Sequence, residues 1–225
     1  MLEKLVDEKI LPELCRKTAE YLTFRQDELS EIRWSINESN IDEGFSKIAK
    51  QCCEKAFGDQ EIPKEVKLSV NIPDLLLEFS AQGENVVRKI ELKSGKINFK
   101  GSAILKLDIN QWTILCRRGR PGTNCEIRYG RYHLGIAMTE RETFQDRSPR
   151  PTPHFQNYQM PDESPKMATK KKAEDIWNVY AQAALRRVLS PGTESWQDLL
   201  VKELVREVLR DPEKFRRLVR GDSES

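Results

Sequence analysis

The chain has 225 residues, enough for one substantial hydrophobic core, and its 38 Lys and Arg residues nearly balance 36 Asp and Glu residues, so bulk charge does not indicate a nucleic-acid partner. Five cysteines without a C-x-x-C pair and only two histidines argue against a disulfide framework or a structural zinc site. Acidic residues interrupt the apolar N-terminus, and no apolar run approaches the roughly 18 residues of a membrane span, so we expect a cytoplasmic protein with no membrane partner.

Helical periodicity marks the first quarter of the chain. Apolar residues recur at helical spacing over residues 1–24, with Pro12 as a kink or break, and their face could pack on the protein's own core or on a second copy. A short helix over 27–40 follows, and then a clearer one over 41–57 that stops at Gly58. We expect this last helix to be the first to pack against a sheet.

Three strands are expected next. The segment 65–70 reads as the first, and 70–93, with the sequence VNIPDLLLEFSAQGENVVRKIELK, contains two runs with the period of pleated strands. If the turn is centred between Gln82 and Gly83, Asp74 lies directly across from Glu91, with Cβ atoms about 5 Å apart. Lys93 points to the same face because side chains alternate along a strand. Two carboxylates and an ammonium therefore converge on one spot.

Such a cluster has a chemical use. Two carboxylates this close repel each other unless a cation lies between them, and Mg²⁺ favours one or two carboxylates together with water and phosphate oxygens. The metal can activate a water, and Lys93 could stabilise the developing charge or assist deprotonation, which suits phosphodiester hydrolysis. The alternative is an ordinary hairpin with a solvated, salt-bridged face.

The pattern Pro73-Asp74, sixteen intervening residues and Glu91-Leu92-Lys93 resembles the PD-(D/E)XK nuclease superfamily, over about thirty residues. The resemblance implies an α/β fold of the restriction-endonuclease type, a mixed β-sheet flanked by helices, with Asp74 and Glu91 as Mg²⁺ ligands and Lys93 beside the water. Relatives often carry a third acid on the preceding helix. Glu38 and Asp42 are the candidates here, because they lie closer to its apolar face than Glu43 does; a helix N-terminal acid without such a role is the alternative.

Basic residues predominate over residues 88–131. The candidates for contacts with double-stranded DNA follow the motif or lie in the loop RRGRPGTN: Lys96, Lys100, Arg117, Arg118 and Arg120. A solvated basic loop without a role is equally compatible with the pattern. Because no G-x-x-x-x-G-K-[ST] sequence surrounds Gly95-Lys96, we expect no nucleotide-triphosphate site.

The rest of the chain gives weaker signals. Residues 110–116 could be a helix or a strand, and the apolar run 132–139 suggests a buried strand. The proline-rich segment 147–166 is either a linker or a loop over a DNA groove. Its possible donors are Arg147, Arg150, His154, Asn157 and Gln159.

Two helices are expected at the C-terminal end. The first covers 169–189, and the second begins with a capping box of Ser195 and Asp198. Its apolar face carries Leu199, Leu200, Leu204, Val205, Val208 and Leu209.

We therefore expect a single nuclease domain over 1–225, with a core over 38–140 and helical extensions over 1–37 and 167–219. Within the superfamily, a compact chain without helicase, ATPase or zinc modules most resembles a type II restriction endonuclease acting as a homodimer on a palindromic site. A repair nickase and a junction resolvase are the alternatives within the superfamily. A non-catalytic DNA-binding protein that retains the fold is the alternative outside enzymes.

Overall fold

The computed structural model describes residues 1–32, 43–71, 74–95, 110–117, 123–136, 154–163, 175–176, 178, 181–182 and 196–220. Contacts divide the chain into two compact units. The first comprises Met1–Ala137 and Pro151–Ile176 and holds a β-sheet with its helices. The second comprises Met138–Arg150 and Trp177–Ser225 and holds helices α7 (Trp196–Arg210) and α8 (Pro212–Arg220).

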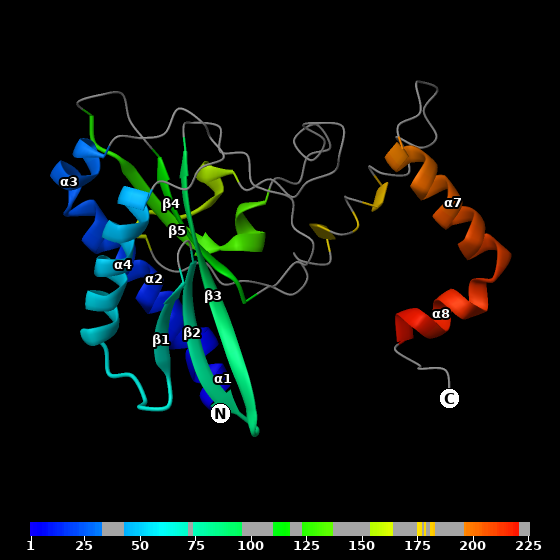
Figure 1. Cartoon of the computed structure of the whole chain (residues 1–225), viewed down its shortest axis with the longest axis horizontal. Helices are drawn as coiled ribbons and strands as arrows, with labels where there is room; N and C mark the ends of the chain where they lie inside the picture. Colours follow the sequence, from blue (N-terminus) through cyan, green and yellow to red (C-terminus); the bar gives the residue numbers. More distant parts are fainter. Residues whose placement is uncertain are drawn as a thin grey trace. The chain divides into compact units, whose positions relative to one another are not determined.

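A mixed five-stranded sheet forms the centre of the first unit (Figure 1). Its order is β1 (Lys67–Asn71), β2 (Asp74–Ala81), β3 (Glu84–Gly95), β4 (Trp112–Arg117) and β5 (Glu126–Arg131). The first three strands make an antiparallel meander, β4 runs parallel to β3, and β5 is antiparallel to β4. The expected α/β architecture, a mixed sheet flanked by helices, is confirmed, and residues 110–116 prove to belong mainly to a strand.

A two-residue turn joins β2 to β3. Gln82 and Gly83 both have positive φ, 55° and 85°, as a type I′ hairpin turn requires, and glycine adopts that conformation without steric cost. The strand pairing that follows from this turn places Asp74 opposite Glu91, and the expected register is confirmed.

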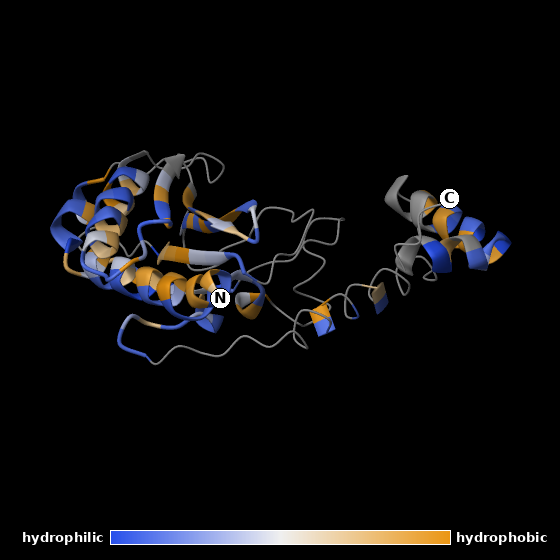
Figure 2. Ribbon diagram, turned by 90° about the horizontal axis from the view of Figure 1, so that it is seen from below, coloured by the Kyte–Doolittle hydropathy of each residue, from blue (hydrophilic) through white to orange (hydrophobic). Residues whose placement is uncertain are grey.

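Helices cover one face of the sheet. The chain enters through α1 (Leu2–Leu5), a π-helical turn η1 (Val6–Ile10) and α2 (Leu11–Thr23); the π turn directly precedes Pro12, which has no N–H to donate to a helical hydrogen bond. Helix α2 packs on β4, β5 and α4 (Glu43–Gly58), and apolar residues recur along it in Figure 2. The apolar face of the N-terminal helices therefore packs within the chain, where it covers the sheet.

The hydrophobic core lies between these helices and the sheet. On α4 one face is buried: Phe45, Ile48, Ala49, Cys52 and Ala56. They meet alternate residues of the central strands, among them Leu75, Leu77, Phe79, Ile90, Leu92 and Ile114. The short α3 (Gln26–Glu31) joins this layer through Leu29, and Gln26 hydrogen-bonds both backbone groups of Cys125. Of the helix expected over 27–40, residues 33–40 lie outside the described part of the chain.

The prediction of a buried strand over 132–139 was wrong for its first four residues, and residues 137–139 lie outside the described ones. Tyr132–Gly135 form a buried 3-10 turn, η2, and the strand lies one segment earlier, in β5. A short apolar run without alternation fits a buried turn as well as a buried strand, so periodicity could not separate the two.

All five cysteines, which are Cys15, Cys52, Cys53, Cys116 and Cys125, are buried thiols outside any disulfide. Burial raises the pKa of the Cys53 thiol to about 12 and that of the Cys15 thiol well above its usual value. Thiolate is therefore scarce at neutral pH, as expected for reduced core cysteines. Among the helices of the described residues, none combines the length and apolar character needed to cross a bilayer.

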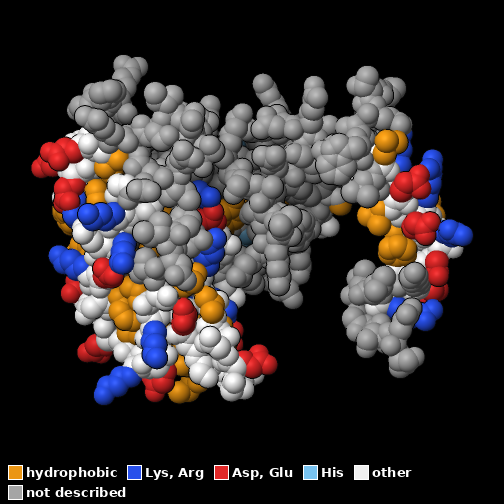
Figure 3. Space-filling model, in the orientation of Figure 1, with side chains coloured by type: hydrophobic (Ala, Val, Ile, Leu, Met, Phe, Trp, Pro, Cys, Tyr) orange, Lys and Arg blue, Asp and Glu red, His pale blue; other side chains and the backbone are white. Residues whose placement is uncertain are grey.

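In the second unit, α7 carries an exposed apolar face. Leu199, Leu204, Val205 and Leu209 are all exposed, and Figure 3 shows hydrophobic side chains along one side of the helix and charged ones along the other. Ion pairs such as Arg206–Glu203 link neighbouring turns of the charged side. The helix expected to begin near Ser195 is therefore present as α7, with its amphipathic pattern. Of the other expected helix, 169–189, the structure describes only short helical pieces, in which Ile176 is buried.

An ionic network ties the N-terminal helix to β3. Arg88 is only 9% exposed and donates hydrogen bonds to Asp7 over 2.7 and 3.0 Å and to Glu3 over 2.5 Å. Arg131 donates to the backbone carbonyl of Asp7 and lies over the ring of Trp112. Arg88 and Arg131 thus belong to the helix-covered side. The two arginines at the ends of the basic stretch 88–131 therefore contact the N-terminal helix.

Replacing Arg88 should destabilise the first unit. Arg88→Met keeps an apolar stem over Phe79 but leaves two carboxylates without their partner, so we expect the free energy of unfolding to fall by about 2–3 kcal/mol in urea titrations. Arg206→Met, which removes an exposed ion pair, is the matched control and should cost under about 0.5 kcal/mol. Equal effects of the two variants would contradict this role of the network.

Candidate functional site

The face of the sheet opposite the core carries the candidate site. Strand pairing puts Asp74, Glu91, Thr113 and Gly130 in one row across β2, β3, β4 and β5. The next row contains Lys93, Leu115 and Arg128. Since alternate residues such as Ile90 and Leu92 are buried in the core, the side chains of Glu91, Lys93 and Arg128 point away from it.

The Glu91 side chain has two polar contacts with described residues of the site. Its carboxylate forms an ion pair with Lys93 through Oε1 and accepts a hydrogen bond of 2.6 Å from Gln111 Nε2 through Oε2. The side chains of Glu91 and Lys93 remain 13% and 22% exposed. The expectation that these two share a face is confirmed, and the pair is close to solvent without being fully solvated.

Asp74 begins β2 directly across from Glu91, and this backbone position is what the structure describes of it. The candidate third acids Glu38 and Asp42 lie outside the described residues. Among the described residues there is no group of three or more His, Cys, Asp or Glu that could hold a metal ion. Two facing carboxylate positions suit Mg²⁺, which usually retains several waters and uses one or two carboxylates.

Of the candidate DNA-contacting residues, only Arg117 is described; Lys96, Lys100, Arg118 and Arg120 are not. Arg117 ends β4, pairs with Glu126 and lies 5.2 Å from the centre of the Phe155 ring. Arg128 shares both partners, with its guanidinium also 5.2 Å from that ring centre. The two arginines are therefore held in place by an acid and an aromatic ring on the side of the sheet that carries Lys93.

The proline-rich segment closes over part of this face. Its described part contains η3 (Phe155–Asn157) and Gln159, which exchanges two backbone hydrogen bonds with Tyr129 of β5. Phe155, Tyr158 and Gln159 are buried. Residues 154–160 thus pack on the sheet and are not a linker, while Arg147 and Arg150 lie outside the described residues.

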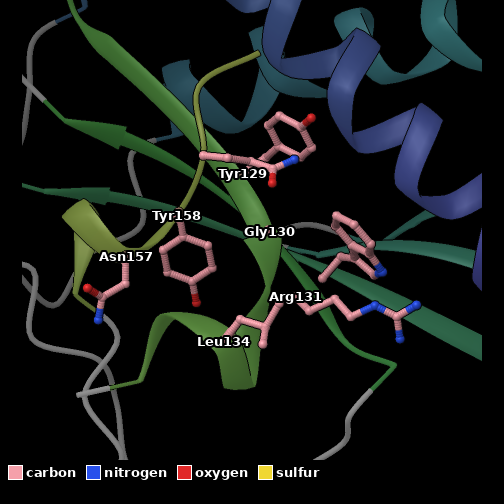
Figure 4. Close-up of a pocket in the computed structure, with 8 residues that line it drawn as sticks. Tyr129, Gly130, Arg131, Leu134, Asn157 and Tyr158 are labelled. Atoms are coloured by element: carbon pink, nitrogen blue, oxygen red, sulfur yellow. The ribbon is translucent and has the colours of Figure 1, made fainter. Parts of the chain in front are cut away.

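Tyr158 is the side chain that this segment inserts. In Figure 4 its ring lies beside β5 at Gly130, with the hydroxyl directed toward the η2 turn, and that hydroxyl donates a 2.9 Å hydrogen bond to the carbonyl of Tyr132. Burial, reinforced by the nearby Tyr132 hydroxyl and the Glu91 charge, raises the pKa of Tyr158, so the group stays a protonated donor. A small pocket beside it has room for about one water.

Sequence reasoning missed Gln111 and Tyr158. For Gln111 no local signal exists, because its contact with Glu91 depends on the parallel pairing of β3 with β4. For Tyr158 a faint signal did exist, since Phe155 and Tyr158 are aromatic residues in an otherwise polar, proline-rich segment.

Comparisons of the chain with family models, curated proteins and solved structures found no match.

Two glycines make room for the Tyr158 ring. A Cβ on Gly130 would lie 2.6 Å from a ring carbon, and one on Gly135 would overlap the ring more severely. Gly135→Ala should therefore displace Tyr158 and lower the free energy of unfolding by about 2 kcal/mol. The double variant Gly135→Ala/Tyr158→Leu should lose less than the sum of the two single variants.

Gly58→Ala is the control for this experiment, because no atom lies within 4 Å of the added methyl group. We expect a change within about 0.5 kcal/mol for it. Strict additivity of Gly135→Ala and Tyr158→Leu in urea titrations would contradict the steric account.

Proposed function

We propose that the protein is a Mg²⁺-dependent endodeoxyribonuclease of the PD-(D/E)XK type that hydrolyses phosphodiester bonds in duplex DNA, most like a type II restriction endonuclease. The observation that carries this proposal is the placement of Asp74 across from Glu91, with Lys93 paired to the same carboxylate. Those residues are the ones on which the superfamily resemblance rests.

The order of elements supports the same proposal. Helix α4 precedes an antiparallel meander, and the motif lies on the second and third strands of that meander. This is the order that the resemblance implies for the start of a restriction-endonuclease core.

In the proposed chemistry, Asp74, Glu91 and Lys93 have separate roles. Asp74 and Glu91 would hold the ion, which supplies Lewis acidity and a water of lowered pKa when bound. Lys93 lies next to Glu91 on the open face, where its ammonium can stabilise negative charge that develops on a phosphate or assist the loss of a proton from water. Because both side chains are partly shielded from solvent, such charge stabilisation is stronger than at a fully exposed site.

We further propose a homodimer. One chain supplies one cluster, whereas a duplex has two antiparallel scissile bonds, and a two-fold axis in the protein would match that of a palindrome. The N-terminal helices use their apolar face within the chain, so the exposed leucines of α7 are the better candidates for contact between copies.

Removing any of the three site residues should abolish cutting. We expect Asp74→Ala, Glu91→Ala and Lys93→Ala each to lower the rate of plasmid cleavage in Mg²⁺ at least about 100-fold, because each loses a metal ligand or a charge stabiliser. Glu78→Ala, on the same face of β2 but two rows away, should cut at the wild-type rate. Ca²⁺ should support DNA binding without cutting.

The cleavage products separate the alternatives. Discrete fragments from a long DNA are expected of a restriction enzyme, whereas single-strand nicks would favour a repair nickase, and cutting confined to branched DNA would favour a junction resolvase. Full cutting by the Asp74→Ala protein would refute the site. Binding with no cutting in any divalent metal would leave a DNA-binding protein.

The basic loop should govern salt dependence. Arg118→Ala/Arg120→Ala removes two charges, so the slope of log Kobs against log salt should become shallower by about 1.8, at about 0.9 per lost phosphate contact. Lys64→Ala/Lys67→Ala removes the same charge from exposed positions at the start of β1 and should leave the slope unchanged. Equal slopes for both double variants and the wild type would place the DNA elsewhere.

A further inference from the structure

Gln111 lies next to the candidate site although it is distant from the motif in sequence. It precedes β4 by one residue, and the parallel pairing of Glu91 with Thr113 brings the start of β4 beside Glu91. Its Nε2 donates to Glu91 Oε2 over 2.6 Å. The backbone carbonyl of Gln111 accepts a 2.9 Å hydrogen bond from the backbone N–H of Tyr132. This bond fixes the backbone from which the Gln111 side chain extends.

The Glu91 carboxylate is thus held at both oxygens, by Lys93 at Oε1 and by Gln111 at Oε2. Two contacts on opposite oxygens define the plane of the carboxylate as well as its position. Each carboxylate oxygen has about two lone-pair sites, so these two contacts with described residues leave one further bond per oxygen available. The carboxylate is therefore oriented without being saturated.

We propose that Gln111 is a positioning residue that orients Glu91 toward a divalent cation shared with Asp74. The inference rests on the proposed metal site and adds a residue outside the Asp and Glu-x-Lys pattern. A neutral amide suits this task, because it donates a hydrogen bond without adding a positive charge that would repel the ion. Partners that hydrogen-bond a metal-ligating side chain are typically worth about 10–100-fold in metal affinity.

Metal affinity of the free protein tests the proposal without reference to activity. Mn²⁺ serves as the probe in calorimetric or electron paramagnetic resonance titrations of the full chain. Gln111→Met keeps the length and volume of the side chain and the backbone bond to Tyr132 but removes the donor. We expect its Kd for Mn²⁺ to rise about 10-fold or more. Its melting temperature without metal should stay close to that of the wild type.

Gln60→Met is the matched control, because the Gln60 amide bonds the carbonyl of Ala56, on α4. It should bind Mn²⁺ as the wild type does. A packing role for Gln111 would appear as weakened binding in Gln111→Ala with wild-type binding in Gln111→Met, and that result would overturn the proposal.

The same titrations distinguish failure of the Gln111 role from failure of the metal site itself. Wild-type affinity in Gln111→Met, together with weakened binding in Glu91→Ala, would overturn the role of Gln111 and leave the metal site standing. Absence of Mn²⁺ binding by the wild-type protein, or equal binding by Glu91→Ala, would overturn the metal site and this inference with it.

Discussion

The register of the β2–β3 hairpin is the constraint on which the candidate site depends. Positive φ angles at Gln82 and Gly83 make a two-residue turn, and such a turn leaves one pairing for the strands that it joins. A slip of one residue would turn Glu91 and Lys93 into the apolar core and Leu92 out of it. Burying these two charges among apolar side chains would cost far more free energy than a different turn could gain. The apolar pattern and the turn therefore favour the same register.

The two faces of the sheet treat charge in different ways. On the helix-covered side Arg88 meets its acids at the margin of the core, and the network serves to attach the N-terminal helix. On the other side Glu91 and Lys93 keep partial contact with solvent, and Tyr158 closes only the neighbouring part of the face over Gly130 and Gly135. A charged pair that is partly shielded from solvent but accessible is compatible with the proposed chemistry on a phosphate.

Much of the fold around the motif could be predicted, and the reasons are local. Alternation and a Gly-containing turn gave the strands of the hairpin and the facing of Asp74 and Glu91, because both depend on residues close together in sequence. The buried turn at Tyr132 was missed because an apolar run has no period to decide it. Gln111 was missed because its partner is reached only through pairing between strands that are far apart in the chain. Likewise, the sequence shows that Arg88 is basic, but only the packing of a distant helix shows that its charge is consumed.

The burial of every cysteine has a practical consequence for studying this molecule. Thiol-specific reagents attack the thiolate of an accessible cysteine, and here all five thiols are buried, with the pKa of Cys53 raised to about 12. We therefore expect the native protein to react little with maleimides. A single new cysteine, for example in place of exposed Glu84 at the tip of the β2–β3 hairpin, would carry a fluorophore or spin label at a chosen position, with no native thiol removed from the core.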